Sequence, residues 1–112
     1  MAYNEKTEER ISELVSRWRD ITRRKMFGGI CYLLKGNMFC GVYKEFLILR
    51  LGERGAATAL GSSHARPMDI TGKPMKGWVM VEPAGFEGEA LLCKWLGKAK
   101  AFAETLPSKK KS

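Results

Sequence analysis

The spacing of apolar residues along the chain predicts a helix at each end and strands between them. Over residues 4–21 the apolar positions recur every three or four residues, which is typical of an amphipathic helix with one buried stripe. Asn4 is a candidate N-cap for this helix. Residues 88–106 repeat the helical spacing and predict a last helix that ends before Pro107.

The segment after the first helix predicts an antiparallel meander. Apolar runs over 26–34, 38–43 and 46–51 are separated by turn signals at 35–37 and 44–45. Connections this short cannot cross over, so neighbouring strands must run antiparallel. The first two runs are apolar on both faces, and we therefore expect other elements or a partner subunit to cover both of their faces.

The remaining segments predict a short helix and a second hairpin. An Ala-rich stretch over 53–60 lies between two glycines and favours a brief helix, which the loop 62–67 follows. Residues 68–70 and 77–81 predict a hairpin across a Gly- and Pro-containing turn. The fold class is therefore α+β, with helices packed on an antiparallel sheet in the order α-β-β-β-α-β-β-α.

Length and composition limit this fold to one domain. The chain has 112 residues, of which 45% are hydrophobic and 29% charged, as in globular domains. We expect residues 1–107 to form the domain and residues 108–112 to form a disordered lysine tail. No apolar run reaches the roughly 18–20 residues of a membrane helix, and the polar N-terminus lacks a signal core. These features predict a cytoplasmic protein without a membrane partner.

The net charge of +8 is unevenly distributed. Three of the charges belong to the tail, and Arg17 and Arg19 are expected to complement the dipole at the end of the first helix. Two further groups of basic residues, with one nearby tryptophan, form the candidate interaction surface: Arg23, Arg24, Lys25, Arg66, Lys73, Lys76 and Trp78. Cations beside an aromatic ring are typical of surfaces that follow a nucleic-acid backbone, although the chain lacks known nucleic-acid-binding motifs.

The sequence offers few residues for chemistry. A zinc site needs three or four ligands, whereas the chain has one histidine, His64, and three cysteines without paired spacing. We expect the thiols of Cys31, Cys40 and Cys93 to be buried and reduced. The side chains of Cys31 and Cys40 would lie on opposite faces with a 35–37 turn, or on one face with a Gly36-Asn37 turn.

Catalysis has equally little support. Nucleophilic catalysis could use only His64, whose neighbours Ser62 and Ser63 are unsuited to a triad. The pair Gly28-Gly29 lacks the context of a phosphate-binding loop, and it favours close packing or a bulge where a strand begins. We therefore predict no enzyme, no catalytic residue, no cofactor and no metal.

Three stretches of the sequence together resemble a known family. These are Met26–Gly29, Met38–Val42 and Ala65–Val79, the last containing the specific run Arg-Pro-Met-Asp-Ile-Thr-Gly-Lys-Pro-Met-Lys-Gly-Trp. They resemble the TfoX (Sxy) N-terminal domain family over nearly the whole chain, from the first helix to about Leu106. The resemblance implies a fold like that of secretion chaperones, with the order α-β(3)-α-β(2)-α.

The resemblance also implies a regulatory role. Full-length members are competence regulators that act in transcription with the cyclic-AMP receptor protein and carry a helical C-terminal domain. This chain is expected to be a stand-alone member without that domain. We therefore predict a non-enzymatic regulatory or protein-interaction module, a homodimer, with a protein partner in transcription regulation. The alternative is a nucleic-acid-associated accessory protein that uses the basic patches.

Overall fold

The computed structural model describes residues 3–26, 28–69, 72 and 75–108, which form one six-stranded antiparallel sheet with three α-helices. The elements in chain order are α1 (Glu5–Val15), β1 (Ile21–Met26), β2 (Gly29–Leu34), β3 (Asn37–Tyr43), β4 (Phe46–Arg50), α2 (Gly52–Ala59), β5 (Ala65–Pro67), β6 (Trp78–Val81), the 3-10 helix η1 (Pro83–Gly85) and α3 (Glu89–Ala103). The strands lie in the order β1-β2-β3-β4-β6-β5. The predicted α+β class and element order are confirmed, and one further strand, β1, precedes the expected three.

The first helix is shorter than the sequence suggested. Asn4 caps it as expected, because its side chain accepts a hydrogen bond from the backbone N–H of Thr7 at 3.1 Å. The helix ends at Val15, so Arg17 and Arg19 follow it and do not lie in its last turn. The chain then reverses, and β1 pairs with β2 from Ile21 opposite Leu34 onward. Ile21, which the apolar spacing assigned to the first helix, therefore belongs to a strand, because its backbone pairs with β2.

The second hairpin begins earlier than predicted. Residues 65–67, expected to be loop, form β5 and pair with β6, with Arg66 opposite Met80. Met68 lies beyond this strand and is buried. Residues 70 and 71, like 73 and 74, fall outside the described part of the chain. Residues 109–112 of the expected tail also lie outside it.

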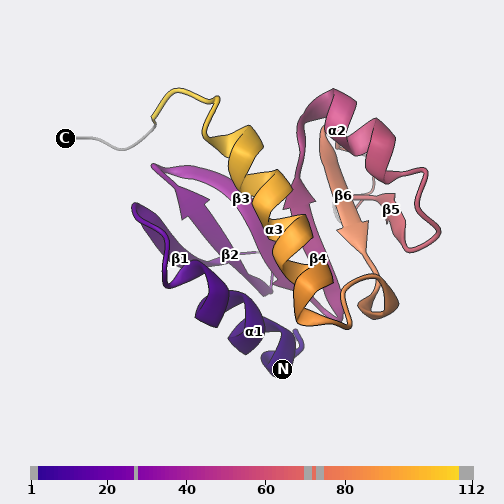
Figure 1. Cartoon of the computed structure of the whole chain (residues 1–112), viewed down its shortest axis with the longest axis horizontal. Coiled ribbons are helices and arrows are strands. Elements are labelled where there is room, and N and C mark those ends of the chain that lie inside the picture. Colours follow the sequence, from indigo (N-terminus) through magenta and orange to yellow (C-terminus); the bar gives the residue numbers. More distant parts are fainter. Residues whose placement is uncertain (1–2, 27, 70–71, 73–74, 109–112) are drawn as a thin grey trace.

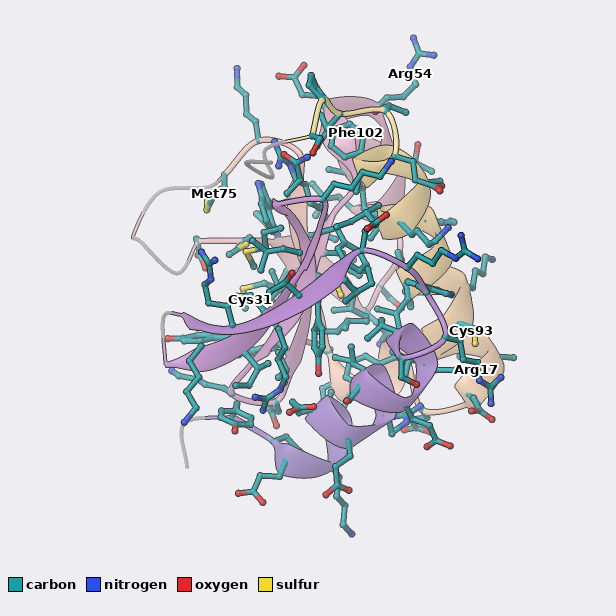
Figure 2. All side chains as sticks on the ribbon, turned by 90° about the vertical axis from the view of Figure 1, so that its left-hand side faces the viewer. Arg17, Cys31, Arg54, Met75, Cys93 and Phe102 are labelled. Atoms are coloured by element: carbon teal, nitrogen blue, oxygen red, sulfur yellow. The ribbon has the colours of Figure 1, made fainter. Side chains whose placement is uncertain are left out.

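The helices α1 and α3 pack on one face of the sheet, which we call the helix-covered face (Figure 1). Its core combines alternate strand residues with the apolar stripes of the helices, and its largest fully buried members include Ile11, Phe39, Leu47, Leu92 and Leu96. The opposite face is the open face. Figure 2 shows Cys31 and Met75 on that side of the sheet, and Cys93 of α3 on the other.

Close approach of strands explains the glycine at the start of β2. A Cβ at Gly29 would lie 2.1 Å from the carbonyl oxygen of Val42 on β3, so only glycine fits there. This confirms the expectation of close packing at Gly28-Gly29. No helix of the described residues combines the length and the apolar character needed to cross a membrane.

Candidate interaction surface

The open face carries a small apolar cluster of its own. Ile48, Met68 and Met80 are its buried centre. Half-buried side chains surround this centre: Met38, Tyr43, Phe46, Met75 and Trp78. Methionine is flexible and polarisable, and it recurs on surfaces that adapt to a binding partner. The open face thus has a packed centre and a partly exposed margin of methionine and aromatic groups.

Arginine side chains lie against the aromatic residues of this margin. The guanidinium of Arg66 lies 5.2 Å from the ring centroid of Phe46, and that of Arg50 lies 5.6 Å from the ring centroid of Trp78. These distances permit cation–π attraction, which holds the arginine heads beside the apolar centre. The margin is consequently both apolar and cationic.

Arg23, a predicted surface residue, has a side chain that is 46% exposed, and it also takes part in the packing of α1 on the sheet. Its Nε donates to Oε1 of Glu8 at 2.9 Å, while the hydroxyl of Tyr32 donates to Oε2 of the same carboxylate at 2.9 Å. Glu8 lies on α1 and is buried, so this bond ties β1 and β2 to the helix above them. The hydrogen bond to Glu8 raises the pKa of Arg23 above its usual value.

The predicted basic sets do not form one surface. Arg24 pairs with Cys31 on the open side of β1, whereas Lys25 pairs with Ile30 on the helix-covered side. Arg66 lies on β5 at the other edge of the sheet, five strand spacings from β1. At about 4.8 Å per spacing this separation is roughly 24 Å. The two basic sets are therefore separate patches at opposite edges of the sheet.

The other predicted residues lie near the β5 edge. Trp78 and Lys76 line a cleft of about 410 Å³ with Ala56 of α2 and with Leu60, which directly follows that helix. Lys73 lies outside the described residues. Trp78 is therefore the predicted residue that belongs most clearly to the open face, because it also packs against its cluster.

The imidazole of His64 and the guanidinium of Arg66 both lie next to the carboxylate of Glu82. Arg66 forms an ion pair with Glu82, and Nδ1 of His64 lies 4.0 Å from Oε2 of Glu82. The His64 side chain is 43% exposed, so it is a surface group at the sheet edge. The hydroxyl of Ser62 accepts a hydrogen bond from the backbone N–H of His64 at 3.4 Å, whereas the imidazole itself faces the carboxylate of Glu82.

The two sheet cysteines lie on opposite faces. Cys31 is opposite Gly41 on the open side, whereas Cys40 joins the helix-covered core. Burial raises the pKa of Cys31 to about 11 and that of Cys40 well above its usual range. Both thiols are therefore protonated at neutral pH and poorly nucleophilic. Their predicted burial is confirmed, but the prediction for Cys93 is wrong, because it is exposed on α3.

Within the described ranges no three His, Cys, Asp or Glu side chains are placed to hold a metal ion. The residues that sequence reasoning missed are those of the open-face cluster, above all Met38, Phe46, Met75 and Met80. Their signal was the apolar character of the strands on both faces. That signal did not show which of the two faces the helices would leave uncovered.

Comparison with known proteins connects this architecture to one family. No curated protein and no solved structure matches the chain significantly. The family model of the TfoX N-terminal domain matches residues 13–103, which include all six strands, α2 and α3. On that match the chain belongs to the TfoX N-terminal domain family.

Proposed function

We propose that this domain is a non-enzymatic regulatory module that binds protein, and that its contact surface is the open face of the sheet. One observation carries the proposal. Met38, Tyr43, Phe46, Met75 and Trp78 keep part of their surface in solvent around a buried apolar centre. Concentrated apolar surface of this kind is a mark of interaction sites.

The composition of the open face suits a protein partner. Interface cores are enriched in aromatic residues, methionine and arginine and depleted in lysine and carboxylates. The open face has these enriched types, with Arg50 and Arg66 held against aromatic rings. Such arginines reach a partner with little loss of conformational freedom, because the rings already restrict them.

We propose a second copy of the chain as the partner. A two-fold dimer places the same patch of both chains in contact, so an apolar centre meets an apolar centre. It would cover the apolar side chains at the margin of the open face that stay partly exposed in the single chain, among them Met38, Phe46 and Met75. The three free cysteines favour a reducing compartment, and we propose the cytoplasm.

Light scattering of the full chain tests the dimer. We expect the wild type to have about twice the chain mass of 12.6 kDa. The variant Met38→Gln with Met75→Gln keeps side-chain size but makes the margin polar, and should weaken the dimer by at least about tenfold. The control, Leu91→Gln, makes polar a large apolar residue that is 45% exposed on α3, on the other side of the sheet from the open face.

The control variant should dimerise like the wild type. A wild-type mass of one chain at micromolar concentration would remove the homodimer. A dimer equally strong in the open-face variant would show that the contact lies elsewhere on the molecule. Far-ultraviolet circular dichroism of each variant confirms that the fold is retained.

The alternative function, nucleic-acid association, is not supported by the residues that suggested it. Arg23 is bound to Glu8, and Arg24 and Arg66 lie at opposite edges of the sheet. A nucleic-acid contact would therefore need a different cationic surface from the one that the sequence indicated.

A further inference from the structure

A cleft at one end of the molecule gathers cations from segments that are distant in sequence. It has a volume of about 570 Å³ and lies where the α1–β1 connection, the β2–β3 turn and the chain after α3 meet, toward the left in Figure 1. Four basic residues line it, and we call them the basic pole: Arg17, Arg19, Lys35 and Lys100. Two acidic residues, Asp20 and Glu104, also line the cleft.

Most cations of the basic pole are available for a ligand. Lys100 pairs with Glu104 at 3.1 Å, and its Nζ lies 5.4 Å from the ring centroid of Trp18. Arg17, Arg19 and Lys35 are exposed, and within the described chain no carboxylate lies at ion-pairing distance from them. The cleft is therefore lined by four basic and two acidic side chains, which gives it a net positive charge.

Hydrogen bonds hold the three segments in place. The backbone N–H of Lys35 donates to the carbonyl of Asp20 at 3.0 Å. The buried side chain of Asn37 donates through Nδ2 to the carbonyl of Pro107 at 2.9 Å. The chain after α3 is thereby attached to the β2–β3 turn. Lys109, Lys110 and Lys111 follow in the sequence but lie outside the described residues.

Helix dipoles explain only part of the clustering. The carbonyl ends of α1 and α3 favour nearby cations, and Lys100 lies in the last turn of α3. Arg17 and Arg19 follow the end of α1, and Lys35 belongs to a β-turn. The dipole effect falls off within the last turn, so these three residues gain little from it.

We propose that the basic pole binds the phosphodiester backbone of nucleic acid. Arginine forks and lysine ammonium groups are the usual phosphate contacts. Lysines are by contrast depleted from protein interfaces, and two of the four cations of the pole, Lys35 and Lys100, are lysines. This surface is separate from the open face, so nucleic-acid binding and dimerisation can succeed or fail independently.

Fluorescence anisotropy with a short labelled DNA duplex and its single strand tests the proposal. The pole variant combines Arg17→Ala, Arg19→Ala and Lys35→Asn. Asparagine is chosen because Lys35 has a positive φ of 51°, which asparagine tolerates. The control combines Lys6→Ala, Arg54→Ala and Lys94→Ala, three exposed helix residues away from the cleft, and removes the same charge.

We expect the wild type to bind at about 50 mM salt and to lose affinity steeply toward about 200 mM. The pole variant should bind at least about tenfold more weakly, and the slope of log K against log salt should fall by about 2 to 3. The control should keep the wild-type slope, because it removes no phosphate contact.

Three results would overturn the proposal. One is no binding by the wild type at low salt, and another is an equal loss in the pole and control variants, which would indicate net charge alone. The third is displacement of the DNA by polyglutamate as efficiently as by unlabelled DNA, which would indicate an acidic protein ligand. If thermal unfolding shows that the triple variant is not folded, Arg17→Ala and Arg19→Ala are measured singly.

Discussion

Cys31 lies opposite Gly41, although the β2–β3 turn would otherwise place it opposite Cys40. The turn residues are Lys35 and Gly36, so pairing starts with Leu34 opposite Asn37. A β-bulge then shifts the register between Tyr32 and Leu33, and Tyr32 pairs with Cys40. The extra residue lets Phe39 and Cys40 both join the helix-covered core. The bulge is thus the reason that the two thiols do not meet.

We predict that Gly41→Ala strongly destabilises the domain. A Cβ at position 41 would lie 2.5 Å from the carbonyl oxygen of Ile30 and 3.2 Å from the Cα of Cys31. Both obstacles are backbone, so β2 and β3 would have to separate, at a cost of about 2 kcal/mol or more. Urea unfolding measures this loss. Gly97→Ala is the control, because a Cβ there meets nothing within 4 Å, and it should be neutral or slightly stabilising.

Alkaline pH should destabilise the fold through two buried groups. Burial, and secondarily the hydrogen bond to Glu8, raises the pKa of Tyr32 from 10.0 to about 12. Burial raises the pKa of Cys31 from 9.0 to about 11. Each group is uncharged when protonated and has a higher pKa in the folded protein than in the unfolded chain. Its contribution to the stability of the fold is therefore fully present below the pKa of the unfolded chain, and it is lost as the pH rises through the pKa of the folded protein. The free energy of unfolding should therefore fall between pH 9 and 12.

The size of this loss is on the order of 2 kcal/mol for each group. Urea unfolding at several pH values should show a shallower decline above pH 10 for Tyr32→Phe than for the wild type. The matched control is Tyr43→Phe on the open face, which leaves Tyr32 and its Glu8 partner in place. A Tyr32→Phe curve parallel to that of the wild type would contradict the assignment.

Two arginines with carboxylate partners should differ in their contribution to stability. Arg23→Ala removes a donor from Glu8, whose side chain is only 11% exposed, and should cost about 1 to 3 kcal/mol. Arg66→Ala removes an ion pair with Glu82, which is 33% exposed, and should cost at most about 1 kcal/mol. Thermal or urea unfolding compares them directly. Equal losses would show that burial of the carboxylate does not determine the effect.

Asn37 should control the attachment of the chain after α3. Its side chain is 2% exposed and donates to the carbonyl of Pro107. Asn37→Asp keeps the size but removes the donor, and should cost about 1 to 2 kcal/mol. Limited proteolysis should then cleave after α3 faster than in the wild type. Unchanged cleavage would show that this hydrogen bond does not hold the segment.

The candidate surfaces were only partly predictable. Trp78 and Arg66 were identified from the sequence because aromatic and basic residues are conspicuous near turns. The ion pair of Arg23 was not predicted, because its partner Glu8 lies 15 residues away and only the packing of β1 against α1 brings them together. The basic pole was not found for the same reason, since its members come from three distant segments.

The sequence by itself determined the types and order of the elements, because helical and strand periodicities and turn residues act over a few neighbours. It therefore predicted α2, α3 and the meander correctly. Only the tertiary structure decided that β1 forms, that β5 starts at Ala65 and that a bulge separates Cys31 from Cys40. It also decided which face stays open. These outcomes depend on pairing and packing between segments far apart in the chain. The spacing of apolar residues within one segment does not indicate those contacts.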